Sequence, residues 1–322
     1  MSFALGVDLG GSTLRAALVD DTGTVVHSRR AALGERDKNP AAIGELLATT
    51  LADMPREARK SGVTVAVAGS VLAREGVVDV APNLGWRNVP LGDTLTRRLG
   101  EPVRIVNDLN AITYGEAKVG GGRGARDVVC LFVGTGFGAG AVVGGVLHEG
   151  AHGLAPELGH LKVSTARDAR ACGCGHTGCL EAYVGGAHLG GLVCDEVKRS
   201  RRPTSLAKGK GHEGGDCDCR VTAVELAQAA QAGDVVATTV LEGVARQLGW
   251  ALSTSLYTFN PEVVIWGGGV VQGVPGLVER AREQASHLTW ESFFSRVRIV
   301  TTTLGDEAGV IGAALLGLGR PA

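Results

Sequence analysis

The densest group of residues that could do chemistry is a set of three cysteines in a glycine-rich stretch. Cys172, Cys174 and Cys179 fall within eight residues, and His160 precedes the first of them by twelve positions. Three thiolates and one imidazole fill the four-coordinate shell of Zn²⁺, and a site closed in this way is structural. Three ordinary loop cysteines are the simpler alternative, but such crowding is typical of metal ligation. The spacing therefore predicts a structural zinc site.

The other cysteines carry a weaker signal. The chain has seven cysteines, an odd number, and four of them lie in Cys-x-Cys pairs. This usage favours metal ligation in a reducing compartment over a disulfide framework. Cys217 and Cys219, together with His212, could hold a second ion, but no fourth ligand is evident, so a loop with nothing bound is the favoured interpretation.

Two glycine turns, about 125 residues apart, each join two predicted strands. Glycines let a phosphate chain approach closely spaced backbone N–H groups, and nearby hydroxyls add hydrogen bonds. A carboxylate at the end of the first strand could hold Mg²⁺ through water. One such turn could be a plain hairpin, and no Walker motif is present. The candidate phosphate-binding residues are Asp8, Gly10, Gly11, Ser12 and Thr13 in the first turn and Gly134, Thr135 and Gly136 in the second.

A dinucleotide-binding motif is the competing interpretation of the second turn. Gly136, Gly138 and Ala141 match G-x-G-x-x-A, and Glu157 lies near the distance expected of a ribose-binding acid. A dinucleotide site needs a helix that opens at the third small residue. The residues after Ala141 are β-branched and are followed by two glycines, which favours a strand instead.

Polar residues at the ends of strands form a third group. Residues 103–106 read as a strand that delivers Asn107 and Asp108, and a carboxylate there could accept a proton from a hydroxyl group. Converging carboxylates and amides suit a polyhydroxylated ligand, because each sugar hydroxyl needs a partner once water is excluded. With the phosphate turns, they point to sugar phosphorylation. The further candidates for sugar binding are Asn83, Glu157, His160 and Glu181.

Strands and helices alternate along the chain, which predicts an α/β protein with a duplicated strand–turn–strand unit. Asn39 and Pro40 predict the start of a helix, and Thr222 with Glu225 predicts a capping box. The predicted strands cover residues 5–8, 14–19, 24–26, 63–68, 103–106, 127–133, 139–143, 262–266 and 297–302. The predicted helices cover residues 40–54, 222–230, 241–256 and 308–318, and residues 200–220 read as a polar insertion.

Composition excludes several classes of protein. The chain has 322 residues and a net charge of −1, so it lacks the basic surface of a nucleic-acid-binding protein. Residues 128–147 are uncharged and long enough to cross a bilayer, but six glycines among them favour two buried strands. No basic, apolar leader opens the chain. We therefore expect a cytoplasmic protein with neither a nucleic-acid nor a membrane partner.

Taken in order, these motifs resemble the ROK family of bacterial sugar kinases and repressors over nearly the whole chain. The resemblance rests on Asp8-Leu9-Gly10-Gly11-Ser12, Pro82-Asn83-Leu84 with Trp86, Asn107-Asp108, Gly134-Thr135-Gly136, Glu157-Leu158-Gly159-His160, Cys172-Gly173-Cys174 to Cys179-Leu180-Glu181, and Gly267-Gly268-Gly269. It implies an actin-like, ribonuclease-H-type α/β fold in two domains with ATP in the cleft between them. The expected domains are a small one over residues 1–108, completed by a helix over 305–322, and a large one over 109–304 with the zinc loop.

The resemblance also implies roles for individual residues. Asp108 would be the base that takes the proton from the 6-hydroxyl of a hexose, and Asn83, Asn107, Glu157, His160 and Glu181 would hold the other hydroxyls. Asp8, Gly10, Gly11, Ser12 and Thr135 would surround the phosphates and Mg²⁺, and Gly268 and Gly269 would contact the adenosine. His160 would both ligate zinc and touch the sugar, one ring nitrogen for each.

The expected activity is that of an ATP-dependent glucokinase yielding glucose 6-phosphate and ADP, in a homodimer. Kinases for fructose, mannose or N-acetylglucosamine, and a sugar sensor without catalysis, are the alternatives, and polyphosphate is an alternative to ATP. Repressors of this family carry a helix-turn-helix ahead of the kinase-like part, and the first predicted strand leaves no room for one. Two features depart from the family pattern: a slightly longer loop between His160 and Cys172, and the insertion at 200–220.

Overall fold

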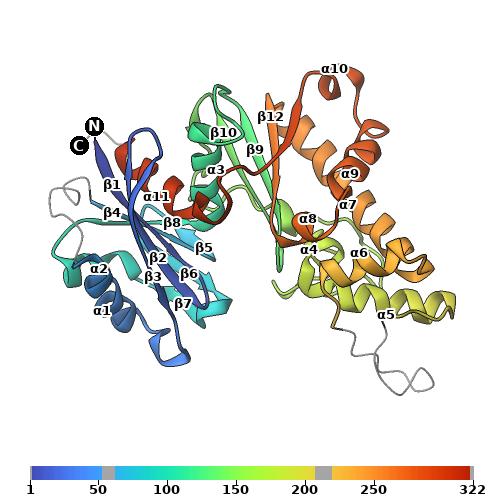
Figure 1. Ribbon diagram of the computed structural model, residues 1–322, viewed down its shortest axis with the longest axis horizontal. Coiled ribbons are helices and arrows are strands. Elements are labelled where there is room, and N and C mark those ends of the chain that lie inside the picture. Colours follow the sequence, from blue (N-terminus) through green and yellow to red (C-terminus); the bar gives the residue numbers. More distant parts are fainter. Residues whose placement is uncertain (1, 53–61, 207–219, 320–322) are drawn as a thin grey trace. The chain divides into compact units, whose positions relative to one another are not determined.

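A computed structural model of the chain describes residues 2–52, 62–206 and 220–319 (Figure 1). Contacts divide the chain into two compact units. Unit 1 comprises Met1–Val128, Gly140–Pro156 and Thr302–Ala322, and unit 2 comprises Val129–Ala139 and Glu157–Thr301. The chain therefore passes from one unit to the other four times.

Unit 1 is built on a five-stranded sheet in the order β3-β2-β1-β4-β8. The strands are β1 (Phe3–Leu9), β2 (Thr13–Asp20), β3 (Val25–Ala32), β4 (Val63–Val67) and β8 (Val103–Asn107). Strands β1, β2 and β3 form an antiparallel meander, whereas β1, β4 and β8 run parallel. The meander predicted from the turn residues is thus confirmed.

Helices cover both faces of this sheet. Helices α1 (Pro40–Leu51) and α2 (Leu91–Leu99) pack on the face that presents Leu5, Val7 and Leu9. Helices α3 (Asp108–Val119) and α11 (Ala308–Leu318) pack on the other face (Figure 1). A Cβ at Gly6 of β1 would collide with the Val310 carbonyl, so glycine allows α11 to lie close against the strand.

A buried carboxylate fixes the segment by which the chain returns to unit 1. Glu116 of α3 is fully buried, and its oxygens accept hydrogen bonds from the backbone N–H groups of Thr303, Leu304 and Gly121 at 2.8–3.0 Å. The Thr302 hydroxyl also donates to it. A hydrogen bond to a charged group contributes more to stability than one between two neutral groups. These bonds therefore hold residues 302–304 against α3.

A second, smaller sheet is formed by the residues between β4 and β8 along the chain. Strands β5 (Ser70–Leu72), β6 (Val77–Ala81) and β7 (Trp86–Val89) pair antiparallel. Asn83 lies in a single 3₁₀ turn (Pro82–Leu84) between β6 and β7. The indole Nε1 of Trp86 donates to the Lys38 carbonyl at 2.6 Å, which joins this sheet to the segment before α1.

The second sheet repeats the first strand for strand. Its strands are β9 (Val128–Val133), β10 (Phe137–Val143), β11 (Val146–Leu147), β12 (Val263–Gly267) and β13 (Arg298–Thr301). Their order, β11-β10-β9-β12-β13, matches β3-β2-β1-β4-β8 position by position, with β9 in the place of β1 and β12 in the place of β4. The duplicated architecture predicted from the two glycine turns is therefore confirmed.

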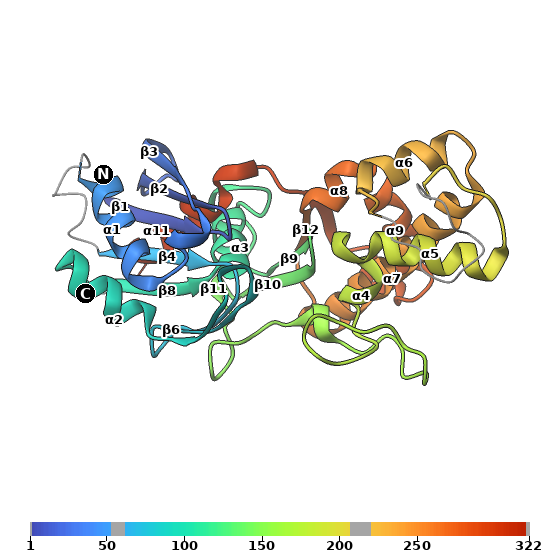
Figure 2. The ribbon, with the colours of Figure 1, turned by 90° about the horizontal axis from the view of Figure 1, so that it is seen from below.

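Helices make up most of unit 2. The central one is α7 (Val235–Phe259), which packs against α4 (Glu181–Val184), α5 (Leu189–Ser200), α6 (Ala223–Gln231) and α9 (Leu277–Ser286) (Figure 2). Two shorter helices are α8 (Gly269–Gly273) and α10 (Glu291–Phe294). The predicted capping box forms at α6, where the Thr222 hydroxyl accepts from the Glu225 N–H and the Glu225 carboxylate accepts from the Thr222 N–H.

Some predictions concern residues that the structure does not describe. The helix predicted over 40–54 forms as α1, with Asn39 as its cap, but its predicted end beyond Ala52 lies outside the described residues. The same holds for residues 207–219 of the predicted insertion, including Cys217, Cys219 and His212 or any ion they could bind. Helix α3 was not predicted at all.

Candidate active site and metal centre

The first glycine turn joins β1 to β2 in unit 1. The Gly10 N–H donates to the Thr13 carbonyl at 2.9 Å and closes the turn. A Cβ at Gly11 would come within 2.8 Å of the Asn83 Cβ, so the absence of a side chain allows Asn83 to lie against the turn. The turn therefore brings two predicted groups, the phosphate-binding backbone and a candidate sugar ligand, into contact.

Asp8 is a half-buried carboxylate one residue before the end of β1. A Cβ at Gly309, beside the start of α11, would lie 3.1 Å from the Asp8 Cγ. Burial raises the pKa of Asp8 above its ordinary value, which the guanidinium of Arg15 partly opposes and the carboxylate of Asp306 reinforces. Desolvation of this kind makes a carboxylate receptive to a cation or to a cation-bound water.

Asn107 and Asp108 form the junction between β8 and α3. Asn107 caps the helix through its side-chain oxygen, which accepts from the Asn110 N–H at 2.9 Å. Its amide group donates to the Gly69 carbonyl at 2.9 Å and to Asp108 Oδ1 at 3.1 Å. Asp108 is the first residue of α3, and the same oxygen accepts from the Leu109 N–H at 2.9 Å. These bonds fix the Asp108 carboxyl at a helix N-terminus, where a negative charge is stabilised.

The register of the parallel strands places these two groups at one edge of the unit 1 sheet. Leu9 of β1 pairs with Val67 of β4, and Val67 pairs with Asn107 of β8. Two strand spacings separate β1 from β8, which is about 10 Å. Ligands of open α/β sheets bind at the carboxyl ends of parallel strands. The first glycine turn and Asp108 therefore lie at the same carboxyl edge, within the length of a phosphorylated ligand.

The second glycine turn joins β9 to β10 and is held by the loop after α4. The N–H groups of Gly186 and Ala187 donate to the carbonyls of Gly134 and Thr135 at 2.8 and 2.9 Å. A Cβ at Gly136 would overlap the Glu181 carboxylate. That carboxylate accepts from the Phe137 N–H at 3.0 Å, so the glycine makes room for Glu181 under the turn.

The glycines after β12 approach the same turn. Gly268 has a φ of 94°, and a Cβ there would come within 2.6 Å of the Val133 carbonyl carbon, immediately before Gly134. Only glycine accepts both this φ and this close approach. The structure therefore brings Gly268 beside the Gly134–Gly136 turn within unit 2.

The predicted zinc ligands converge in unit 2. The donor atoms of His160, Cys172, Cys174 and Cys179 all lie within 4.8 Å of one another. Cys174 Sγ is 3.7 Å from Cys179 Sγ, and Cys172 Sγ is 3.8 Å from His160 Nδ1. Tetrahedral Zn²⁺ with bonds of about 2.3 Å to sulfur and 2.0 Å to nitrogen requires separations of about 3.5–3.8 Å. The donor set and its spacing therefore fit zinc.

The thiols of this cluster differ in their surroundings. Burial, followed by the neighbouring thiol and Glu181, raises the pKa of Cys172 to about 12. Cys174 is exposed; its slight burial opposes the change, but hydrogen bonds from His176 and from the Cys172 and Cys179 thiols lower its pKa to about 6. A divalent cation binds thiolates, so Cys174 is the thiol most readily available to receive it.

His160 links the cluster to the candidate sugar ligands. Its Nδ1 faces Cys172, while its Nε2 lies 3.9 Å from Glu157 Oε2. Burial raises the pKa of Glu157, with His160 lowering it and Glu181 raising it. Glu181 in turn accepts the Cys172 thiol at 3.4 Å. Metal ligands and hydroxyl-binding candidates therefore form one connected group in unit 2.

The predicted site residues thus fall into two groups, one in each unit. The group in unit 1 is Asp8, Gly10, Gly11, Ser12, Thr13, Asn83, Asn107 and Asp108. The group in unit 2 is Gly134, Thr135, Gly136, Glu157, His160, Cys172, Cys174, Cys179, Glu181, Gly268 and Gly269.

Sequence reasoning missed several supporting residues. Gly69 and Gly309 each approach a predicted site residue from a distant part of the chain. Lys162 contacts the cysteine cluster. Cys194 of α5 is disulfide-bonded, whereas Cys130 and the three cluster cysteines are not part of a disulfide. The Gly69-Ser70 pair after a strand was the one local signal that could have marked a backbone approach.

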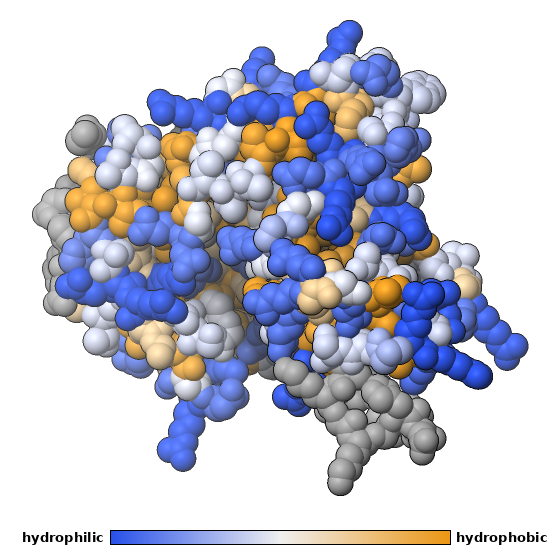
Figure 3. Space-filling model, turned by 45° about the vertical axis from the view of Figure 1, so that its right-hand side comes forward, coloured by the Kyte–Doolittle hydropathy of each residue, from blue (hydrophilic) through white to orange (hydrophobic). Residues whose placement is uncertain are grey.

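The described part of the chain contains no helix that is both long and apolar enough to span a membrane. The prediction that residues 128–147 form strands rather than a helix is confirmed by β9, β10 and β11. On the face drawn in Figure 3, hydrophobic residues lie in separate groups among hydrophilic ones.

Comparisons with known proteins find similar sugar kinases along nearly the whole chain. It is 31% identical to a glucokinase of Streptomyces coelicolor, with 98% of this chain and 97% of the relative covered. It is 33% identical to a glucokinase of Thermotoga maritima, with 96% and 95% covered. The crystal structure of a ROK family glucokinase from Streptomyces griseus, in complex with glucose and AMPPNP, matches with a TM-score of 0.75 at 31% identity, covering 98% of this chain and 99% of that one.

The same comparisons also find regulators. A xylose repressor of Caldicellulosiruptor bescii is 29% identical over 96% of this chain, which spans 76% of the repressor. The fold is the actin-like two-domain α/β fold found in the ROK sugar kinases. The model of the ROK family matches residues 4–319. With that match over nearly its full length, the chain belongs to the ROK family.

Proposed function

We propose that the protein is an ATP-dependent hexose kinase that phosphorylates the 6-hydroxyl group of glucose. The observation that carries the proposal is the strand register of unit 1, by which the first glycine turn and Asp108 share one carboxyl edge of the sheet. A phosphate-binding turn and a candidate base at that separation suit a transfer of phosphate to a hydroxyl group. The glucokinase relatives, matched over nearly their whole length, support glucose as the acceptor.

The proposed reaction needs alignment more than covalent chemistry. Asp108 accepts the proton of the sugar 6-hydroxyl as that oxygen bonds to the γ-phosphorus of ATP, and the bond to the β-phosphate oxygen breaks to release ADP. Asn83, Asn107, Glu157, His160 and Glu181 hold the remaining hydroxyl groups. Backbone N–H groups of the two glycine turns hold the phosphates, and Gly268 and Gly269 contact the adenosine.

Two metal ions complete the proposal. Mg²⁺, held near Asp8 through water, neutralises charge on the phosphates when it is bound. Zn²⁺ bound by His160, Cys172, Cys174 and Cys179 is structural, because all four positions belong to the protein. Since His160 presents Nδ1 to the thiols and Nε2 to Glu157, a bound ion would fix the ring face that reads the sugar.

A sugar sensor without catalysis is the second candidate, and the similarity to a xylose repressor favours it. An assay separates the two. Purified protein is incubated with ATP and glucose, mannose, fructose or N-acetylglucosamine, and ADP release is followed beside calorimetric binding of each sugar. We expect ADP release with glucose in excess of the other sugars. Binding of a sugar without ADP release would establish the sensor instead, and replacement of ATP by polyphosphate in the same assay tests the phosphate donor.

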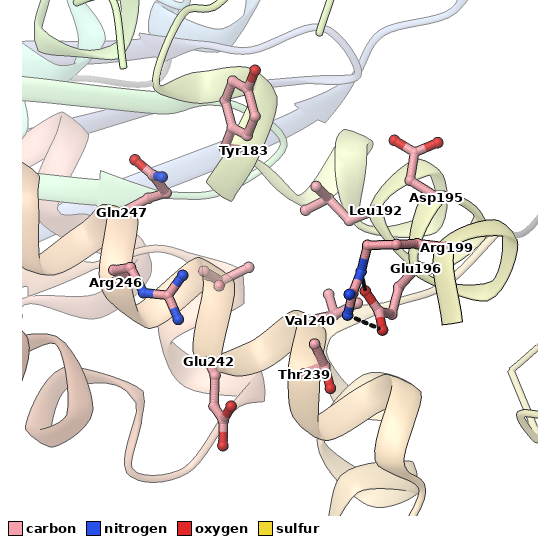
Figure 4. A pocket seen from close by; sticks show the side chains of 12 residues that line it. Tyr183, Leu192, Asp195, Glu196, Arg199, Thr239, Val240, Glu242, Arg246 and Gln247 are labelled. Atoms are coloured by element: carbon pink, nitrogen blue, oxygen red, sulfur yellow. Dashed lines mark hydrogen bonds and ion pairs between the residues drawn. The ribbon is translucent and has the colours of Figure 1, made fainter. Parts of the chain in front are cut away.

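We also propose that the protein forms a homodimer through the face that α5 and α7 share. A pocket of about 460 Å³ opens there, lined by Tyr183, Leu192 and charged residues of both helices (Figure 4). Arg199 is paired with Glu196 at 2.8 Å. In the described part of the chain, Glu242 and Arg246 have no ion-pair partner and are exposed. In a two-fold dimer with antiparallel α7 helices, Glu242 of each copy meets Arg246 of the other.

A cytoplasmic location stays a prediction. The cysteine cluster requires reduced thiols, which suits a reducing compartment.

A further inference from the structure

Lys162 lies beside the cysteine cluster although no motif includes it. It follows His160 by two residues, and it forms an antiparallel bridge with Cys179. Its Nζ donates to the Thr177 carbonyl at 2.7 Å and lies 3.2 Å from Cys179 Sγ. The latter is within hydrogen-bonding distance of sulfur, so the ammonium group is held between the backbone of the cysteine loop and a thiol.

The net charge of the metal-bound cluster indicates what the contact between Lys162 and Cys179 does. Three thiolates and one neutral imidazole around Zn²⁺ leave a net charge of one negative unit. Cys179 and Cys172 are buried, so two of the three thiolates are withdrawn from water. A buried charge needs a compensating partner. Arg170, which is also nearby in sequence, is committed to Asp195 and to the Ala182 carbonyl.

No carboxylate competes for Lys162. Across residues 2–52, 62–206 and 220–319 its ammonium has no ion-pair partner, and its two contacts are the Thr177 carbonyl and the Cys179 sulfur. A lysine whose role was surface solubility would point its ammonium into water. Here the Lys162 side chain is exposed, yet its ammonium group turns back and contacts the cysteine loop.

We propose that Lys162 is a positioning residue of the metal centre: its ammonium compensates the negative charge of the zinc–thiolate cluster and holds Cys179 in the orientation that binds the ion. The inference rests on the proposed zinc site and adds to it a residue outside the four ligands. Hydrogen bonds from such outer groups to ligating atoms strengthen metal binding by about 10- to 100-fold. Because the Lys162 side chain is exposed, salt screens the charge of its ammonium group. We therefore expect the lower end of that range.

The test compares Lys162→Met, Lys162→Arg and Lys198→Met as full-length proteins. Lys198 is an exposed lysine of α5, so its loss changes the net charge equally without touching the cluster. Zinc is measured by mass spectrometry, and its affinity by competition with a chromophoric chelator at low and high salt. Lys162→Met is expected to bind zinc about tenfold more weakly than the wild type. Lys162→Arg and Lys198→Met should stay within about twofold of it.

Salt separates charge compensation from a purely structural role. The difference between wild type and Lys162→Met should shrink as salt rises, because screening weakens a Coulombic contribution. A difference that does not change with salt would overturn the proposal, and so would equal zinc affinity in the two proteins. Wild-type protein without zinc would contradict the metal site itself. Thermal unfolding of each zinc-loaded variant shows whether Lys162→Met is folded before its affinity is compared.

Discussion

The carboxylates of the candidate site have different surroundings, and these assign them different tasks. Asp8 is half-buried and its pKa is raised by desolvation. Asp108 is held at a helix N-terminus by the Leu109 N–H and the Asn107 amide. Glu157 faces the His160 ring. A carboxylate at a helix N-terminus is stabilised as an anion, whereas a desolvated one favours a proton or a cation.

Replacement of Asp108 tests the proposed base. Asp108→Asn retains the shape and the hydrogen bond from the Leu109 N–H but cannot accept a proton. We expect kcat for glucose to fall at least ~100-fold, with the dissociation constant of glucose changed little. Steady-state kinetics and calorimetry measure the two quantities, with Glu75→Gln, an exposed turn residue of unit 1, as the control. Wild-type turnover from Asp108→Asn would refute the role.

Asp8 gives a prediction about pH. Its folded-state pKa lies above its unfolded value, so its contribution to stability is complete below the unfolded pKa and is lost as pH rises through the folded one. Asp8→Asn should therefore raise the melting temperature at pH 7 in the absence of nucleotide. The gain should narrow as pH falls through the raised pKa of Asp8, because the wild-type carboxyl then takes up a proton and loses its buried charge.

Thermal denaturation between pH 4 and pH 8 provides the measurement for Asp8. Glu75→Gln removes an exposed carboxylate and should show no such trend. A stability gain of Asp8→Asn that is the same at every pH would contradict the burial of a charge as its cause. Addition of Mg²⁺ and nucleotide should favour the wild type over Asp8→Asn, because the proposed cation site is lost in the variant.

Residue types at strand ends were predictable from the sequence, but their contacts were not. The strand over 103–106 correctly delivered Asn107 and Asp108, because a β-rich run followed by polar residues is a local pattern. That Asn107 caps a helix and reaches Gly69 depends on β4 lying beside β8. Lys162 was missed for the same reason: seventeen residues separate it from Cys179, and no local pattern marks their bridge.

At the scale of elements, the two hairpins show how a sheet positions a glycine turn at one of its edges. Each hairpin pairs with a strand far along the chain, β4 or β12, that ends at the same edge as its turn. Alternating hydrophobic runs and glycine turns made the strands and the duplication predictable. Helix α3 was not, since its first residues, Asp108 and Asn110, are polar and its amphipathic pattern is weak.

The second hairpin gives a prediction with a matched control in the same turn. At Gly136 an added Cβ would overlap the Glu181 carboxylate, whereas at Gly134 it would meet open space. Gly136→Ala must displace Glu181 and break its bond from the Phe137 N–H. We expect a loss of about 1–3 kcal/mol in the free energy of unfolding and weaker binding of glucose.

Urea denaturation and calorimetry of Gly136→Ala and Gly134→Ala measure these effects side by side. Gly134→Ala should resemble the wild type in both stability and sugar binding, because its backbone φ does not require glycine. Equal behaviour of the two variants would show that Glu181 is not held under the turn.

At the scale of the whole molecule, the proposed dimer is testable by charge reversal. Glu242→Arg or Arg246→Glu places like charges opposite each other across the two-fold axis, which should weaken association at least ~10-fold. The double variant exchanges the charges and should restore it. Sedimentation velocity over a range of concentrations gives the dissociation constants. A monomeric wild type would exclude the dimer, and single variants that associate like the wild type would place its interface elsewhere.

Because the chain returns to unit 1 only after residues 157–301, part of unit 1 stays uncovered during translation. The strands that carry Ala4, Ala17 and Val19 are translated before residues 157–301, whereas the helix that covers them, α11, is translated after those residues. While the ribosome produces residues 157–301, the nascent first unit therefore displays an apolar sheet face to chaperones and to neighbouring chains. A premature stop codon just after Leu304 would retain residues 302–304, which bind Glu116, but would remove α11. The truncated polypeptide could not cover the sheet face that carries Ala4, Ala17 and Val19.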